Sequence, residues 1–102
     1  MTIAAIIVAA GRGTRAGSAQ PKQWHPLMGQ RVIDWTISAF LHHPDIHQIC
    51  VVLHPDDIDT ANLKDVIITT GGATRDASVK NGLGALAPYA PDHVLIHDGA
   101  RA

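Results

Sequence analysis

The chain has 102 residues, which is enough for one domain and too few for two. Hydrophobic residues make up 46% and charged residues 17%, a globular balance that excludes an intrinsically disordered chain. The formal net charge is −1 and no apolar run reaches about 18 residues, so we expect a cytoplasmic protein that binds neither polynucleotides nor membranes.

The charged side chains are unevenly distributed along the chain. Residues 1–31 contain four basic side chains and no acidic one, whereas residues 32–102 contain four basic and all nine acidic ones. We therefore expect the first third of the chain to bind an anion. Because the basic residues lie among glycines and other small residues, a phosphorylated small molecule fits better than a polynucleotide.

Strand and helix patterns alternate through the first half of the chain. Residues 3–10 are continuously small and apolar, which predicts a strand covered on both faces. Residues 31–42 have the apolar spacing of one helix face, and Pro44 ends this helix. Residues 49–53 predict a second buried strand. The single cysteine, Cys50, lies within it and is predicted to be a buried, inert thiol.

The second half of the chain continues the alternation. Residues 66–70 are rich in β-branched side chains and predict a third strand. Val79, Leu83 and Leu86 recur at helical spacing and predict a second helix, although two glycines in this segment each cost about 1 kcal/mol relative to alanine. Residues 94–96 predict a fourth strand.

This alternation predicts a parallel sheet with helices on both faces, joined by right-handed crossovers. Ligands of such sheets bind outside the carboxyl ends of the strands. Most of the unusual polar residues lie in three segments that directly follow predicted strands, residues 11–22, 71–78 and 98–101. The sequence therefore predicts a ligand site at this edge. Because a fourth strand with no following helix leaves apolar surface uncovered, we expect part of a domain; the alternative is a complete small domain.

The segment Ala-Ala-Gly-Arg-Gly-Thr-Arg at residues 9–15 has the composition of a phosphate cradle. Small side chains and two glycines let backbone N–H groups approach an anion closely, while Arg15 and Lys22 supply positive charge. The segment is neither a P-loop nor the dinucleotide-binding fingerprint. The alternative is a glycine-rich turn with solvated arginines. The following Pro-Lys-Gln at residues 21–23 favours a triphosphate site.

Two further segments offer groups to a ligand. Asp98 directly follows a predicted strand, where a carboxylate can hold magnesium (Mg²⁺) against substrate phosphates; the alternatives are a helix N-cap or a partner for Arg101. Residues 71–78 could present backbone groups and the Ser78 hydroxyl to a nucleotide base, or could simply cap a helix through Thr74 or Asp76. The seven histidines lack the spacing of a zinc site.

Together these motifs resemble the 2-C-methyl-D-erythritol 4-phosphate cytidylyltransferase family of the non-mevalonate isoprenoid pathway. The resemblance rests on residues 9–15, Pro-Lys-Gln at 21–23, Gly71-Gly72 with the Arg-Asp-Ala-Ser-Val that follows at 75–79, and His-Asp-Gly-Ala-Arg at 97–101. It covers essentially the whole chain. It implies a Rossmann-like nucleotidyltransferase fold in which residues 1–102 form the amino-terminal, CTP-binding part of a longer domain.

The resemblance also implies a role for each motif residue. Arg15 and Lys22 would be the catalytic cations that stabilise the triphosphate during attack. Asp98 would bind Mg²⁺ and substrate, and Arg101 would approach the methylerythritol phosphate. The residues implied to line the nucleotide are Ala9, Ala10, Gly11, Gly13, Gly72, Arg75 and Ser78.

The implied reaction is attack by the phosphate of 2-C-methyl-D-erythritol 4-phosphate on the α-phosphorus of CTP, with release of pyrophosphate and no covalent enzyme intermediate. The remainder of the family domain would supply a second catalytic lysine, a further metal-binding aspartate and a dimerisation arm. We therefore expect this part alone to be inactive or nearly so, and the full-length enzyme, in some members fused to a cyclodiphosphate synthase, to be a homodimer. The alternatives are another sugar- or polyol-phosphate nucleotidylyltransferase and a non-catalytic nucleotide-binding module.

Overall fold

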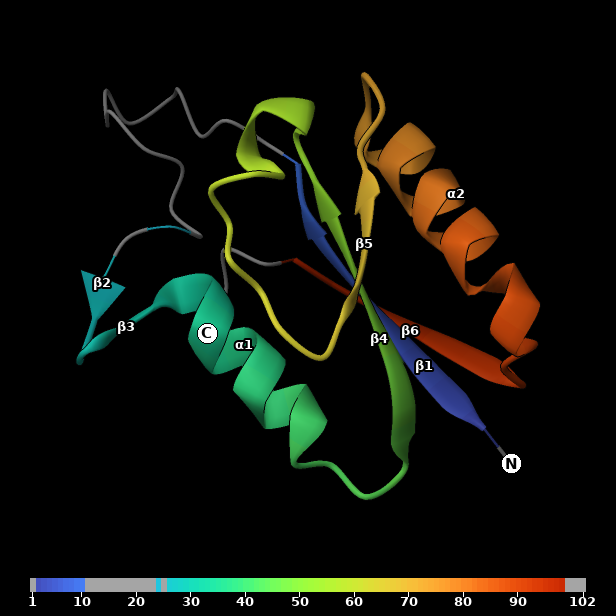
Figure 1. The fold of residues 1–102 in the computed structure, drawn as a ribbon. Helices are drawn as coiled ribbons and strands as arrows, with labels where there is room; N and C mark the ends of the chain where they lie inside the picture. Colours follow the sequence, from blue (N-terminus) through green and yellow to red (C-terminus); the bar gives the residue numbers. More distant parts are fainter. Residues whose placement is uncertain (1, 11–23, 25, 99–102) are drawn as a thin grey trace.

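Four parallel strands form the main sheet of the computed structural model, which describes residues 2–10, 24 and 26–98 (Figure 1). The sheet order is β5-β4-β1-β6, so the chain builds outward from β1 to β5 and then crosses back to the other side of β1. In register, Ile6 of the central strand lies between Cys50 and Ile96. The strands of this sheet are β1 (Ile3–Ala9), β4 (Ile46–Leu53), β5 (Ile67–Thr70) and β6 (His93–Asp98).

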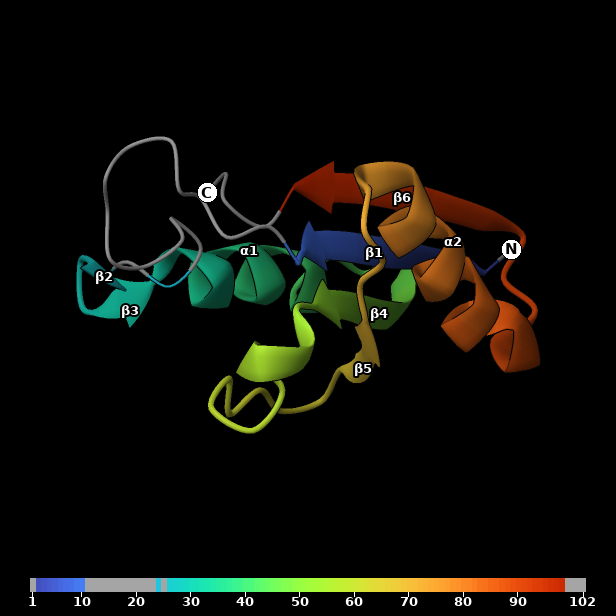
Figure 2. The same ribbon diagram turned by 90° about the horizontal axis from the view of Figure 1, so that it is seen from above.

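The two helices, α1 (Val32–Leu41) and α2 (Arg75–Leu86), lie on opposite faces of this sheet (Figures 1 and 2). On one face Ile33 of α1 packs in a cluster with Ile7. On the other face Leu86 of α2 packs in a cluster with Ile6. Each central strand therefore buries both of its faces, which explains its unbroken apolar sequence and confirms the predicted parallel sheet with helices on both sides.

The boundaries differ from prediction where the pattern is weak. The second predicted strand, residues 49–53, is the carboxyl-terminal part of β4, which begins three residues earlier at Ile46. The earlier residues are only partly buried, so they lack the apolar signal of the rest of the strand. Short 3₁₀ turns follow β4 and α2; they are η3 (Pro55–Asp57) and η4 (Ala87–Tyr89).

The helix α2 is confirmed, but its buried face is not the one marked by Val79 and Leu83. Leu83 is 45% exposed, and the residues buried against the sheet are Ser78, Gly82 and Leu86. Gly82 makes this packing possible, because a Cβ there would lie 3.0 Å from Ile6 Cγ2. A glycine that sequence counts as a weakness of the helix thus lets the helix approach the sheet closely.

The two glycines of α2 should respond oppositely to alanine. Gly84→Ala meets open space and should stabilise the chain by about 0.5–1 kcal/mol through helix propensity. Gly82→Ala should destabilise it by about 1 kcal/mol or more, because the new methyl crowds the buried side chain of Ile6. Urea unfolding of both variants measures the two effects. Equal shifts of the same sign would contradict the packing of α2.

A small antiparallel hairpin precedes α1. Its strands, β2 (Pro26–Leu27) and β3 (Gln30–Arg31), are joined by Met28 and Gly29, which both have positive φ, of 50° and 89°. This is the backbone of a two-residue hairpin turn. The hairpin cannot be predicted from sequence, because two-residue strands show no periodicity.

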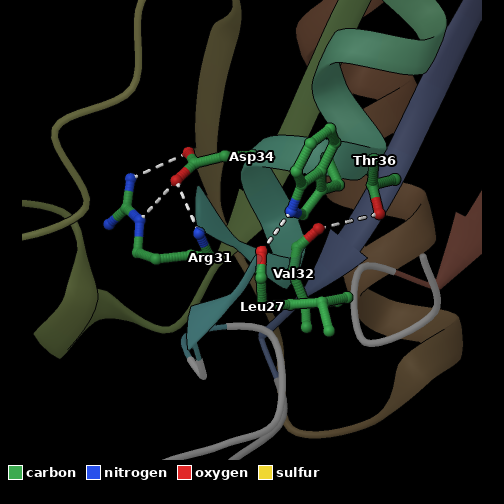
Figure 3. A network of polar contacts seen from close by, with 6 residues as sticks. Leu27, Arg31, Val32, Asp34 and Thr36 are labelled. Atoms are coloured by element: carbon green, nitrogen blue, oxygen red, sulfur yellow. Dashed lines mark hydrogen bonds and ion pairs between the residues drawn. The ribbon is translucent and has the colours of Figure 1, made fainter. Parts of the chain in front are cut away.

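Arg31 and Asp34 fasten this hairpin to α1 (Figure 3). Arg31 donates from Nε to Asp34 Oδ2 at 2.8 Å, from Nη2 to Oδ1 at 3.0 Å, and from its backbone N–H to Oδ2 at 3.2 Å. Trp35 Nε1 also donates to the carbonyl oxygen of Leu27. The side-chain hydrogen bonds from Arg31 are the main reason why the pKa of Asp34 lies below its usual value.

This lowered pKa predicts a pH-dependent loss of stability. The contribution of Asp34 is present above its unfolded pKa of about 4 and disappears as the pH falls through the lower folded pKa. At neutral pH, Asp34→Asn should lower the free energy of unfolding by about 1 kcal/mol, because it weakens the partly exposed ion pair with Arg31. Urea unfolding of both proteins between neutral and strongly acidic pH should show this difference shrinking in acid. A difference independent of pH would contradict the proposed role.

The burial of Cys50 and the exposure of apolar side chains on β6 agree with the sequence predictions. Cys50 is fully buried, and burial raises the pKa of its thiol to about 11, as expected of an inert cysteine. On β6, Leu95 and Ile96 are 48% and 45% exposed, which is the uncovered apolar surface expected beside the fourth strand. Within the described part of the chain, no helix is long and apolar enough to span a membrane.

Candidate functional site

The carboxyl ends of the four strands lie at one edge of the sheet, where the sequence predicts the ligand site. Ala9 at the end of β1 pairs with Leu53 at the end of β4, and Leu53 pairs with Thr70 at the end of β5. On the other side, Val8 pairs with Asp98, the last residue of β6. The predicted common edge is thus confirmed for residues 71–78 and for Asp98, while residues 11–22 and 99–101 lie outside the described residues.

The side chains of Ala9 and Ala10 face the two halves of the core. Ala9 is buried in the cluster beneath α1, and Ala10 packs against the cluster beneath α2. A ligand beyond this strand end therefore meets their backbone rather than their side chains. This is the geometry expected of a cradle made from backbone groups.

The segment Gly71-Gly72 passes very close to the end of β1. A Cβ on Gly71 would lie 2.3 Å from the Cβ of Ala10 and 2.8 Å from Ser78 Oγ, and a Cβ on Gly72 would lie 2.4 Å from the Cβ of Ala77. Both positions therefore require glycine. The two segments that the sequence analysis assigned to the nucleotide are consequently in direct van der Waals contact.

Side chains and backbone of α2 hold this glycine segment in place. Gly72 donates its N–H to Ser78 Oγ at 3.1 Å, and Ser78 is only 2% exposed. Thr74 is the N-cap of α2, since its Oγ1 accepts from the N–H of Ala77 at 3.1 Å. The capping alternative is thus confirmed for Thr74, while a direct contact between Ser78 and a nucleotide base stays a prediction.

Arg75 and Asp98 form an ion pair across this edge. Arg75 Nε lies 3.2 Å from Asp98 Oδ1, joining the first turn of α2 to the end of β6. Their side chains are 55% and 38% exposed, so the pair contributes about 0–1 kcal/mol to stability. The ion pair matters for its location, because it places a guanidinium and a carboxylate side by side at the edge where ligands of such sheets bind. From sequence, the alternatives for Asp98 are a helix N-cap and an ion pair with Arg101, whereas the structure pairs it with Arg75.

The residues at this edge fit a single-carboxylate magnesium site. Mg²⁺ usually takes one or two carboxylates and completes its shell with substrate phosphates and water, and Asp98 supplies a half-exposed carboxylate at the strand end. Among the described residues, no group of three or more His, Cys, Asp or Glu side chains could enclose a metal ion by itself. A magnesium ion here would therefore depend on the phosphates of a bound ligand.

His97, the neighbour of Asp98, belongs to the core rather than to this edge. Its ring packs edge-to-face on Phe40 of α1, with the ring centres 5.5 Å apart. Its Nδ1 is buried and has no hydrogen-bond partner among the described residues. His97 is therefore a packing residue between the sheet and α1.

Several predicted site residues lie outside the described residues, so their predictions stay as they were made. They are Gly11, Gly13, Arg15, Lys22 and Arg101.

Comparisons with known proteins agree with the fold and with the motifs. The family model of 2-C-methyl-D-erythritol 4-phosphate cytidylyltransferase matches residues 3–102. The chain is 51% identical to the cytidylyltransferase of that name from Cereibacter sphaeroides, over 99% of this chain and 48% of the relative. It is 52% identical to a bifunctional IspD/IspF enzyme from Bradyrhizobium, over 96% of this chain and 26% of the relative.

Solved structures give the same result. The crystal structure of Francisella tularensis 2-C-methyl-D-erythritol 4-phosphate cytidylyltransferase superposes with a TM-score of 0.75 at 31% identity, over 99% of this chain and 45% of that one. The chain thus spans about half the length of the single-function relatives that it matches.

Proposed function

The chain belongs to the 2-C-methyl-D-erythritol 4-phosphate cytidylyltransferase family, and from this premise we propose that the carboxyl edge of its sheet binds CTP for transfer of CMP to 2-C-methyl-D-erythritol 4-phosphate. The observation that carries this proposal is the convergence at one edge of the Gly71-Gly72 segment, the Ala9-Ala10 strand end and the Arg75–Asp98 ion pair. These groups supply backbone, cation and carboxylate to a single ligand.

The chemistry that this edge supports is a direct displacement at phosphorus. A phosphate oxygen of the acceptor attacks the α-phosphorus of CTP and forms a new P–O bond. The bond from that phosphorus to the bridging oxygen breaks, and pyrophosphate leaves with the electron pair. Because no group on the protein is alkylated or phosphorylated, the protein's task is to position the two reactants and to neutralise charge.

The residues of this chain divide that task. The backbone around Ala10 and Gly72 would line the nucleotide, and Arg75 would hold Asp98 in place beside it. Arg15 and Lys22 would neutralise the triphosphate. When bound at Asp98, Mg²⁺ would offset part of the phosphate charge. Arg101 would approach the acceptor phosphate, and a homodimer of the full-length protein is part of the same proposal.

A pyrophosphate-release assay tests the proposal and separates it from its alternatives. This chain, supplied with the remaining half of the family domain as a second polypeptide, should release pyrophosphate with CTP and methylerythritol phosphate. Faster release with UTP or with ribitol 5-phosphate would instead indicate another nucleotidylyltransferase. Saturable CTP binding without any pyrophosphate release would indicate a binding module.

A further inference from the structure

The glycine segment at the site is held by a residue that none of the motifs includes. Asn81 lies on α2, and its Nδ2 donates to the carbonyl oxygen of Thr70 at 2.9 Å. Thr70 is the last residue of β5, immediately before Gly71. The side chain of Asn81 thus spans from the helix to the point where the strand becomes the site loop.

The peptide group that this contact fixes is held at both of its ends. Its carbonyl oxygen, from Thr70, accepts from Asn81, and its N–H, from Gly71, donates to the carbonyl oxygen of Leu53 at 2.7 Å. A peptide group bonded on both sides cannot rotate without breaking a hydrogen bond. Its plane is therefore set jointly by β4 and by α2.

The next peptide group is fixed from the same helix. Its N–H, from Gly72, donates to Ser78 Oγ, and Ser78 precedes Asn81 by three residues on α2. Residues three apart lie on the same side of a helix. Ser78 and Asn81 therefore form a pair of side chains that sets the two peptide groups flanking Gly71.

We propose that Asn81 is a positioning residue for the nucleoside end of the ligand. The proposal rests on the proposed function, because Gly72 lies in the segment expected to present backbone groups to the nucleotide base. Gly71 lies in contact with Ala10, so a rotated peptide here would move the loop relative to the end of β1. Asn81 itself touches no ligand and acts through Thr70 and Gly71.

The proposal predicts different effects of Asn81 on binding of the triphosphate and on binding of the nucleoside. The triphosphate is assigned to residues 9–22, which Asn81 does not contact, whereas the nucleoside is assigned to the segment that Asn81 holds. Loss of the Asn81 hydrogen bond should therefore weaken binding of CTP and leave binding of inorganic tripolyphosphate unchanged. A general loss of folding would weaken both ligands together.

Calorimetric titration of the chain with CTP and with tripolyphosphate, both with Mg²⁺, tests this directly. Asn81→Ala removes the donor, and Asn81→Asp keeps the size of the side chain but replaces the donor by an acceptor. Each should raise the Kd of CTP about fivefold, the effect of one net hydrogen bond, and change the Kd of tripolyphosphate by less than about twofold. Lys80→Ala, at the exposed neighbouring position, is the matched control and should change neither Kd.

Amide hydrogen exchange in the ligand-free chain gives a second measurement. Asn81→Ala should accelerate exchange at Gly71 and Gly72 more than at the buried amides of β1, and should lower the free energy of unfolding by no more than about 1 kcal/mol. Unchanged CTP binding in both Asn81 variants, or equal weakening of the two ligands, would overturn the role of Asn81 alone. Failure of the parent chain to bind CTP would overturn the proposed function and this inference with it.

Discussion

Lys22→Ala is expected to lower kcat by about 10²–10³-fold in an enzyme that carries this chain as the first half of a complete family domain. This is the loss seen when one electrostatic donor to a transition state is removed. A compact ammonium can follow a phosphoryl group as negative charge moves toward the leaving pyrophosphate, and alanine leaves that charge without a partner. Pyrophosphate release at saturating CTP measures the effect.

A matched control separates this role from a general effect of positive charge. Lys64→Ala removes an exposed lysine from the connection that precedes β5, away from the carboxyl edge, and should leave kcat unchanged. A change of less than about threefold in kcat for Lys22→Ala would contradict the catalytic role of Lys22.

Gly71→Ala should be the most damaging single substitution at the described part of the site. The new methyl would lie 2.3 Å from the Cβ of Ala10 and 2.8 Å from Ser78 Oγ, so backbone must move to admit it. Overpacking of this kind costs about 1–3 kcal/mol of stability. We expect that loss in urea unfolding, together with loss of CTP binding, because the loop would move away from the end of β1.

The neighbouring alanine allows the steric cause to be tested. Ala10→Gly removes the nearest obstacle, so the double variant Ala10→Gly/Gly71→Ala should recover part of the lost stability, with the Ser78 contact limiting the recovery. Gly71 does not have the positive φ that favours glycine, so backbone strain cannot account for the loss. No recovery in the double variant would show that the close approach to Ala10 is not the cause.

The elements of this fold that sequence predicts best are those with a clear apolar pattern. The strand predicted at residues 3–10 and the helix predicted at 31–42 agree with β1 and α1 to within about one residue. A strand buried on both faces has a continuous apolar sequence, and a helix buried on one face has apolar residues at helical spacing. The orientation of α2 could not be predicted in this way. Its sheet-facing side includes Gly82, and the need for glycine there follows only from the position of Ile6 against the helix.

The sequence predicts the common edge of the candidate site segments but not the contacts between them. Parallel strands alone place residues 71–78 and Asp98 at one edge, which the register confirms. The Arg75–Asp98 pair joins residues 23 positions apart, and the Asn81–Thr70 contact joins residues 11 positions apart. Such contacts depend on how the crossover helix sits on the sheet, and no local pattern in the sequence encodes that placement.

An NMR titration of the ¹⁵N-labelled chain with CTP and Mg²⁺ tests most directly whether the carboxyl edge of the sheet is the nucleotide site. We expect saturable shifts of the amides of Gly71, Gly72 and Arg75, because these groups line the edge where β1, β5 and β6 end. The chemical shifts of the His47 and Asp92 amides, at the opposite edge of the sheet, should not change. Shifts confined to that opposite edge, or no shift of any of these amides at millimolar CTP, would contradict a nucleotide site at the carboxyl edge.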